Sequence, residues 1–163
     1  MPFVFRTFLI FSLLETGAIF GFFYAWVCST MWGLDAAPPE VAIAAMQAMN
    51  ASVRNGVFAV SFFGTPLVLL LTVIMAFATA HRRAGVILAG ALVCAVASVL
   101  ATMSVNVPMN QALAQVALPS DQARTIWAAY SGPWQFWNTL RTVTSGAALL
   151  LVGLAMMQAR APR

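Results

Sequence analysis

Residues 57–85 read VFAVSFFGTPLVLLLTVIMAFATAHRRAG, an apolar run that ends in a short basic turn. The apolar part, residues 57–80, has the ~20 residues that an α-helix needs to cross a bilayer. A second apolar stretch, residues 84–107, follows the turn at once. Because the connection is so short, the two stretches are expected to form antiparallel neighbouring helices.

Residues 8–31 and 134–157 are two further apolar stretches of similar length. Backbone polar groups in lipid must be satisfied within a segment, so all four stretches are expected to be helices. The composition agrees, because 62% of the residues are hydrophobic and only 7% are charged, far from the balance of soluble proteins. We therefore predict an all-α membrane protein with a single domain, residues 1–163, built as an up-down bundle of four transmembrane helices that leaves little of the chain in water.

The arginines predict the orientation of this bundle. One side is basic and carries no acid; its cations are Arg6, Arg82, Arg83, Arg160 and Arg163. The other side is mixed and carries Arg54, Asp35, Glu40, Asp121 and Arg124. Since short basic loops stay in the cytoplasm, we expect both termini there, in a multi-pass protein of a bacterial inner membrane. The positive charge is then explained by its role in orienting the protein in the membrane, and no nucleic-acid partner is expected.

Two longer connections are predicted on the outer side. Residues 34–55 contain two prolines ahead of a strong helix-forming run, which indicates a short helix near the interface. Residues 108–133 contain a helix N-cap signature at Ser120-Asp121. We expect both loops to carry short interfacial helices, which together could act as a lid.

Polar residues mark one face of each of the last two predicted helices. On the third, small or polar residues recur every four positions: Gly90, Cys94, Ser98, Thr102, Asn106 and Asn110. On the fourth, the positions i, i+4, i+7 and i+11 hold Trp134, Asn138, Arg141 and Ser145. We expect these two faces to meet.

Arg141 is the most informative of these residues, because it lies about 10 Å deeper in the membrane than Trp134. A buried arginine is costly unless it reaches out to the interface, finds partners or lines a wet cavity. Two interpretations follow. Arg141 either extends outward to loop carbonyls, or faces a pocket with Asn106, Asn110 and Asn138 and binds an electron-rich oxygen of a ligand. The asparagines favour the second interpretation.

Glu15 is the one acid inside an apolar stretch, and it is either a proton acceptor or a carboxyl group hydrogen-bonded between helices. The aromatic residues fit an interfacial belt, with Trp134 and Trp137 as candidate pocket walls. No metal and no cofactor are expected, because the sequence has no histidine pair, no Cys-x-x-Cys and no carboxylate cluster.

Two motifs lie at the outer ends of the last two predicted helices. They read NVPMN, residues 106–110, and WQFWNTLRT, residues 134–142. Together they resemble the signature of the anthrone oxygenase family, and weaker similarity lies in GFFYAW at 21–26, MQAMN at 46–50 and FFG at 62–64.

The resemblance implies a small four-helix membrane protein that, as in fungal relatives, oxidises an anthrone-type aromatic polyketide to a quinone with dioxygen and no organic cofactor. It implies that Arg141 stabilises an enolate that the asparagines orient. The residues it implies for substrate contact are Trp26, Gln47, Asn50, Trp134 and Trp137. The general base is missing from this scheme, and its candidates are Glu15, His81 and Asp121.

Two classes of function remain open at this point. The first is an oxidoreductase that acts on a small lipophilic aromatic or quinone-type compound in a pocket at the outer end of the bundle. The second is a non-catalytic membrane module that binds a lipid, a quinone, a partner protein or a second copy of itself, with the polar faces joining the helices.

Overall fold

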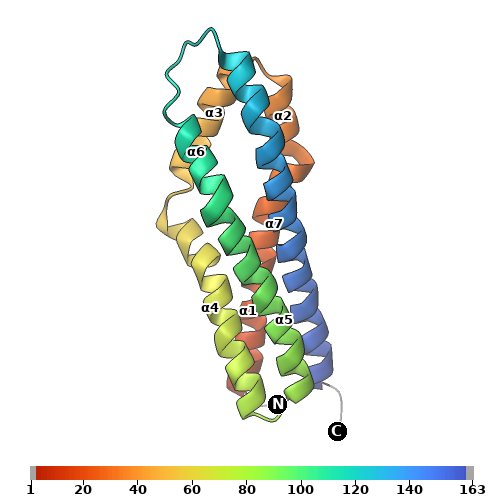
Figure 1. The fold of residues 1–163 in the computed structure, drawn as a ribbon. Helices are drawn as coiled ribbons and strands as arrows, with labels where there is room; N and C mark the ends of the chain where they lie inside the picture. Colours follow the sequence, from red (N-terminus) through yellow and green to blue (C-terminus); the bar gives the residue numbers. More distant parts are fainter. Residues whose placement is uncertain (1–2, 161–163) are drawn as a thin grey trace.

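A computed structural model describes residues 3–160. Its helices form one elongated bundle in which four rods run side by side (Figure 1). The elements in chain order are α1 (Phe3–Ala25), η1 (Trp26–Thr30), α2 (Met31–Ala36), α3 (Pro39–Ser52), α4 (Gly56–Ala78), α5 (Arg82–Ala101), η2 (Thr102–Asn106), α6 (Val107–Leu113) and α7 (Ala123–Arg160). Here η denotes a π-helical turn.

The predicted fold class is confirmed, because four helical segments are long and apolar enough to cross a membrane. They are Phe3–Ala36, Gly56–Ala78, Arg82–Leu113 and Ala123–Ala159. The described part of the chain contains helices and no strands. The start of α1 and the end of α7 lie at the same end of the bundle as the turn between α4 and α5 (Figure 1). We refer to this end as the inner end.

Three of the four rods are longer than predicted. They have 34, 32 and 37 residues, about 50 Å each at ~1.5 Å per residue, whereas the hydrocarbon of a bilayer is about 30 Å thick. Only α4, with 23 residues, has a length that matches it. The three longer rods therefore exceed the hydrocarbon thickness that the predicted spans matched.

We call the part beyond the top of α4 the cap. It consists of α2, α3, α6 and residues 123–131 of α7. The separate helix expected in residues 34–55 is α3, which begins at Pro39. The region 108–133 differs from the prediction, because residues 108–113 continue the third rod and α7 begins at Ala123 rather than at Trp134.

Packing in the cap explains why α7 extends so far. Pro133 lies inside α7 without ending it, although a proline removes one backbone hydrogen bond. The turns that precede it bury Trp127 and Tyr130, each 7% exposed, in an apolar core shared with Ile43 and Met46 of α3. Burial of such large side chains stabilises helical turns that lack the hydropathy of a membrane span.

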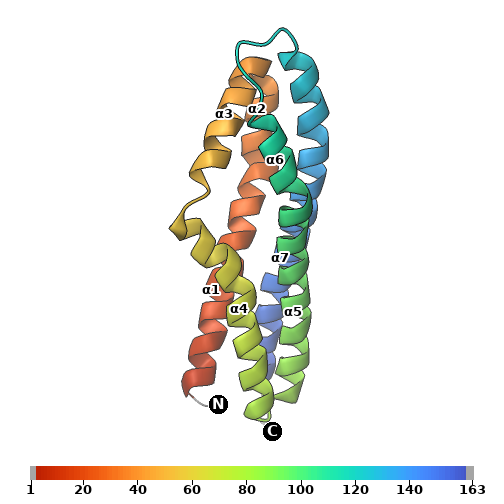
Figure 2. The ribbon, with the colours of Figure 1, turned by 60° about the vertical axis from the view of Figure 1, so that its left-hand side comes forward.

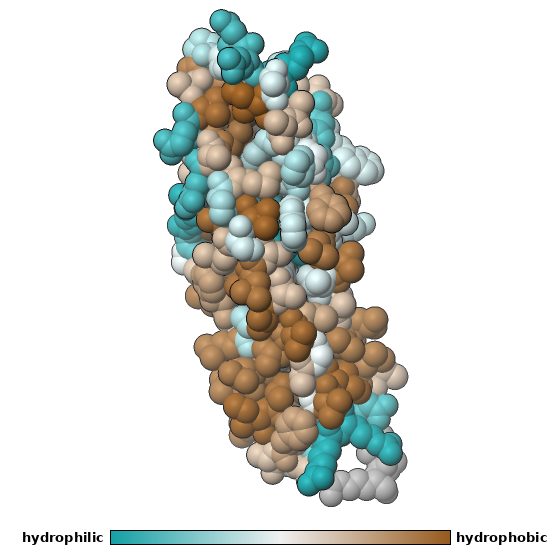
Figure 3. Space-filling view, viewed as in Figure 1, coloured by the Kyte–Doolittle hydropathy of each residue, from teal (hydrophilic) through white to brown (hydrophobic). Residues whose placement is uncertain are grey.

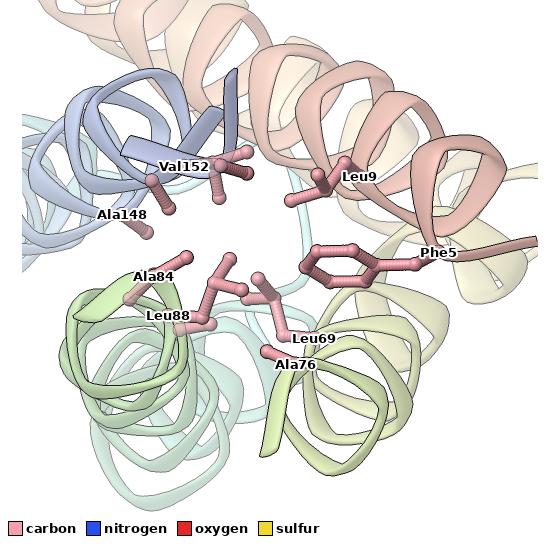
Figure 4. Close-up of a cluster of buried hydrophobic side chains, with 12 residues drawn as sticks. Phe5, Leu9, Leu69, Ala76, Ala84, Leu88, Ala148 and Val152 are labelled. Atoms are coloured by element: carbon pink, nitrogen blue, oxygen red, sulfur yellow. The ribbon is translucent and has the colours of Figure 1, made fainter. Parts of the chain in front are cut away.

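A second apolar core fills the inner half of the bundle. Figure 4 shows side chains of all four rods converging there, with Phe5 and Leu9 from α1, Leu69 from α4, Leu88 from α5 and Val152 from α7. Alanines on α5 and α7 let these two helices pack closely. On the face that Figure 3 shows, hydrophobic residues cover most of the inner half, and hydrophilic residues gather on the cap and at the inner end. The polar residues of interest lie between the two cores.

Candidate functional site

Two π-helical turns face α7 at the boundary between the inner half and the cap. One is η1, on the first rod, and the other is η2, on the third rod; both contact α7. A π-helical turn widens a helix locally, and such turns are common at functional sites. Thr102 and Asn106 begin and end η2, and both are buried. Prediction from periodicity assumed regular α-helices here and did not foresee these turns.

Arg141 is buried opposite these turns, with 5% of its surface exposed. Its Nη2 donates to Oδ1 of Asn138 at 2.9 Å, and its Nη1 donates to Oγ1 of Thr102 at 3.3 Å. Its Nε has no hydrogen-bond partner within the described residues. The guanidinium carbon lies 4.5 Å from the ring centre of Phe23 and 5.3 Å from that of Trp134. The side chain therefore faces inward, held by neutral groups and aromatic faces.

No carboxylate neutralises this cation among residues 3–160. A buried charge that meets only dipoles and ring faces is expensive, and an electron-rich oxygen close to it would lower that cost. The Nε–H is one donor that the described residues leave without an acceptor. The arrangement can thus hold an anionic or strongly polarised ligand oxygen.

Asparagines fix the geometry around Arg141. Asn138 donates through Nδ2 to the carbonyl of Phe23 at 3.1 Å, which joins α7 to α1 and leaves Oδ1 directed at Arg141. Asn110 accepts through Oδ1 from the Tyr130 hydroxyl at 2.7 Å and from the indole Nε1 of Trp134 at 2.9 Å. These contacts hold the rings and the guanidinium in one arrangement.

Asn106 lies on the same face. Its Nδ2 is 3.4 Å from the carbonyl of Trp134, and its Oδ1 is buried without a hydrogen-bond partner among the described residues. The four polar positions of α7 that were expected on one inward face, Trp134, Asn138, Arg141 and Ser145, are each at most 5% exposed. The prediction that this face meets the polar stripe of the third rod is confirmed.

A cavity of about 410 Å³ opens beside Arg141. This volume falls in the range of about 300–1,000 Å³ typical of small-molecule sites. Most of its wall is apolar and aromatic, including Phe22, Trp26, Phe58 and Phe62. The polar groups in the wall are few and come from Asn50, Arg54, Asn55, Thr102, Asn110 and Arg141. A flat apolar ligand with one polar edge matches this distribution.

The predicted site residues divide into three groups. Those that line the cavity are Trp26, Asn50, Asn110, Trp134 and Arg141. Asn138 and Asn106 stand behind this lining, where they contact Arg141 and the backbone of Trp134. Gln47, Trp137 and Glu15 are not among the lining residues.

The last three residues have other surroundings. Gln47 donates to the carbonyls of Leu113 and Val116, both at 2.9 Å, and so ties α3 to the end of α6. Trp137 is half-buried beside Phe136, with ring centres 5.7 Å apart. Glu15 lies lower on α1, its Cα about 12 Å below that of Phe23. Its Oε2 is buried and has no partner within the described chain.

The other suggested general bases also lie away from the cavity. His81 is in the α4–α5 turn at the inner end, where Nδ1 is 3.0 Å from Oγ1 of Thr79. Asp121 is exposed in the loop before α7. Among the described residues, no carboxylate lines the cavity and no group of three metal-ligating side chains occurs.

Sequence reasoning did not single out Phe23, Phe58 or Thr102 as site residues. Thr102 was visible as a member of the stripe of six small or polar residues spaced four apart, and Phe23 as part of the GFFYAW segment. Phe58 carried no signal, because a phenylalanine near the start of an apolar span is ordinary. Its place in the wall depends on how α4 leans against α1.

Comparison with known protein families identifies a match over most of the last three rods. A sequence model of the family described as anthrone oxygenase matches residues 56–151, which run from the start of α4 to the inner half of α7. This range includes Asn106, Asn110, Trp134, Asn138 and Arg141. No curated protein and no solved structure matches the chain. Because the matched range covers more than half of the chain, the protein belongs to the anthrone oxygenase family.

Proposed function

We propose that this protein is an integral membrane oxidoreductase that oxidises a lipophilic aromatic substrate of the anthrone or hydroquinone type with dioxygen. The observation that carries this proposal is Arg141: a buried guanidinium that has no carboxylate partner among residues 3–160, at the wall of an aromatic cavity of about 410 Å³. Family membership supports the reaction class.

Electrostatics give Arg141 its role in this proposal. An anthrone tautomerises to a phenol, and loss of the phenolic proton gives an electron-rich anion. Arg141 holds the oxygen of that anion in a low-dielectric wall, where a preorganised charge stabilises more than it would in water. The proton passes to water that shares the cavity, so the step needs no carboxylate base from the chain.

Dioxygen then takes electrons from the bound anion. A carbon–oxygen bond forms at the former methylene carbon, the oxygen–oxygen bond breaks, and the second oxygen atom leaves as water with the hydrogens lost from the substrate. The product is the quinone. The chain supplies position and charge: Trp26 and Trp134, with ring centres 5.0 Å apart, form one wall, and Asn110 holds Trp134 in place.

Topology is part of the same proposal. The inner end carries Arg6, Arg82 and Arg83, whereas the cap and the connections beside it combine Arg54 and Arg124 with Asp35, Glu40 and Asp121. Positive charge of this kind keeps an end in the cytoplasm. We infer that both termini are cytoplasmic and that the cap and the cavity lie toward the opposite side.

Oxygen consumption tests the proposal directly. The full-length protein in lipid nanodiscs is supplied with anthrone, while an oxygen electrode and quinone absorbance follow the reaction. We expect Arg141→Gln to lower the rate by about 100-fold, the size typical of losing one group that stabilises a developing anion. Arg124→Gln is the matched control and should leave the rate unchanged, because Arg124 is an exposed arginine of α7 that does not line the cavity. Equal rates for Arg141→Gln and the wild type would overturn the mechanism.

The non-catalytic alternative has one specific observation in its favour. Asn138 and Gln47 join helices through backbone carbonyls, as polar residues do when they serve only to hold a membrane bundle together. In that case Arg141→Gln would lower the thermal unfolding midpoint, and the wild-type protein would bind anthrone or a quinone without consuming oxygen.

A further inference from the structure

A second hollow, of about 600 Å³, lies on the surface beside the cavity. Its wall comes from α1, η1, the end of α3, the α3–α4 connection and the start of α4. It shares with the inner cavity Phe22, Trp26, Met49, Val53, Asn55 and Phe58. The two hollows are therefore separated only by side chains. Phe22 and Phe58, whose ring centres are 4.8 Å apart, stand between them.

This surface hollow exists because α4 is short. The first rod continues past the level of Gly56, but α4 begins there after the non-helical connection that follows α3. Figure 2 shows the α3–α4 connection displaced to the side of the first rod. No helix continues α4 upward along α1, so the flank between them is left uncovered in the described structure.

The height of the hollow can be compared with the thickness of the hydrocarbon. The helix rise puts Ala18 about 22 Å and Trp26 about 34 Å above the start of α1. On α4, Ser61 lies about 26 Å above Ala78 by the same rise. If the hydrocarbon, about 30 Å thick, is counted from the inner end, its cap-side boundary falls within the height of the hollow. We call the opening of the hollow to the surface the mouth. Arg141 lies at the same level, about 27 Å above Ala159.

The residues around the mouth are apolar and exposed, as expected of residues that contact lipid. Val57 and Phe63 on α4 are 84% and 53% exposed, and Tyr24 on α1 is 49% exposed. Exposed apolar side chains at this level contact acyl chains in a bilayer. The polar residues in the wall are confined to Ser52, Asn55 and Ser61.

We propose that the hollow is a lateral entrance, through which a membrane-dissolved apolar molecule passes between α1 and α4 to reach Arg141. This inference rests on the proposed function for the identity of the molecule, a lipophilic aromatic with one electron-rich oxygen. The occupant follows from continuity with the inner cavity: the apolar body of the molecule crosses the hollow, and its oxygen ends at the guanidinium. Phe22 and Phe58 turn aside to let it pass.

Lipid quenching tests the entrance without any substrate. The full-length protein is placed in nanodiscs whose phosphatidylcholine is brominated on the acyl chains, and the emission of Trp26 is taken as the difference between wild type and Trp26→Phe. We expect bromine to quench Trp26, which lines both hollows. Ser61→Phe fills the hollow without touching the inner cavity and should remove most of this quenching. Val60→Phe, at an exposed position that lines neither hollow, is the matched control and should leave it unchanged.

Binding kinetics test the route. In nanodiscs, Ser61→Phe should slow the association of anthrone by about tenfold while its equilibrium dissociation constant stays the same, because the plug obstructs passage and leaves the bound state alone. Val60→Phe should associate at the wild-type rate. Equal association rates in all three proteins would overturn the lateral route. If anthrone does not bind at all, the proposed function fails. The lateral entrance is then tested by the quenching experiment alone, and unquenched Trp26 emission would overturn it.

Discussion

Asn138→Leu removes the residue that connects Arg141 to the first rod. Asn138 is 1% exposed; it accepts from Arg141 Nη2 at 2.9 Å and donates to the carbonyl of Phe23 at 3.1 Å. Leucine has nearly the same size and fits a membrane helix, so the change removes polarity with little change in volume. It leaves two buried polar groups, the guanidinium and the Phe23 carbonyl, without their partner.

The two lost hydrogen bonds set the magnitude. A bond to a charged group contributes about 1.5–3 kcal/mol and a neutral one about 0.5–1.5 kcal/mol. We therefore expect Asn138→Leu to lower the free energy of unfolding by about 2–4 kcal/mol, a fall in the unfolding midpoint of about 5–15 °C for a chain of this length. The rate of quinone formation should fall as well, because Arg141 loses its orientation.

A double-mutant cycle isolates the charged bond. Unfolding of Asn138→Leu, Arg141→Met and the double variant is followed by circular dichroism in detergent, with Thr139→Leu, an exposed neighbour on α7, as the control. Once Arg141 is gone, Asn138→Leu should cost about 1.5–3 kcal/mol less than it does in the wild type. A coupling energy near zero, with unfolding midpoints equal to that of Thr139→Leu, would refute the claim that Asn138 holds the guanidinium.

Two further predictions concern the cap and the cavity wall. Asp35 accepts hydrogen bonds from three side chains of α7, so Asp35→Ala should speed amide hydrogen exchange in α2 and in residues 123–131, whereas Asp121→Ala, in the exposed loop, should not; equal exchange in the two would contradict this. Trp134→Phe should weaken anthrone binding in titrations, because it removes both a cavity wall and the Nε1 bond to Asn110, while Trp137→Phe should leave the affinity unchanged. The reverse order of affinities would show that the ligand lies on the other side of α7.

The bundle was predictable because each span is uniformly apolar and the turn at residues 81–85 leaves one way to connect its neighbours. The lengths of the rods were not. Hydropathy falls beyond Trp134, yet Trp127 and Tyr130 continue the same inward face, and packing against α3 keeps α7 helical through Pro133. The hydropathy of a segment indicates where the hydrocarbon ends. The end of the helix depends instead on how far its side chains remain packed against other helices.

The candidate site shows the same division. Spacing on α7 placed Trp134, Asn138 and Arg141 on one buried face, because a helix fixes directions within itself. The spacing could not show that Trp134 lines the cavity and Trp137 does not, because this depends on which neighbouring ring each of them contacts. Gln47 has a polar side chain in the right segment, but its amide is taken up by carbonyls at the end of α6, a partner that only the folded cap provides.

The π-helical turn η2 sets the direction in which the later residues of the third rod point. Residues spaced by four drift around an ordinary α-helix by about 40° at each step, so Gly90 and Asn110 would end on nearly opposite sides of a regular helix. A wider turn advances less per residue and offsets part of that drift, which keeps Thr102, Asn106 and Asn110 directed at α7. Ordinary α-helical winding over the same five residues would rotate every position after Thr102 further around the rod and turn both asparagines away from their partners.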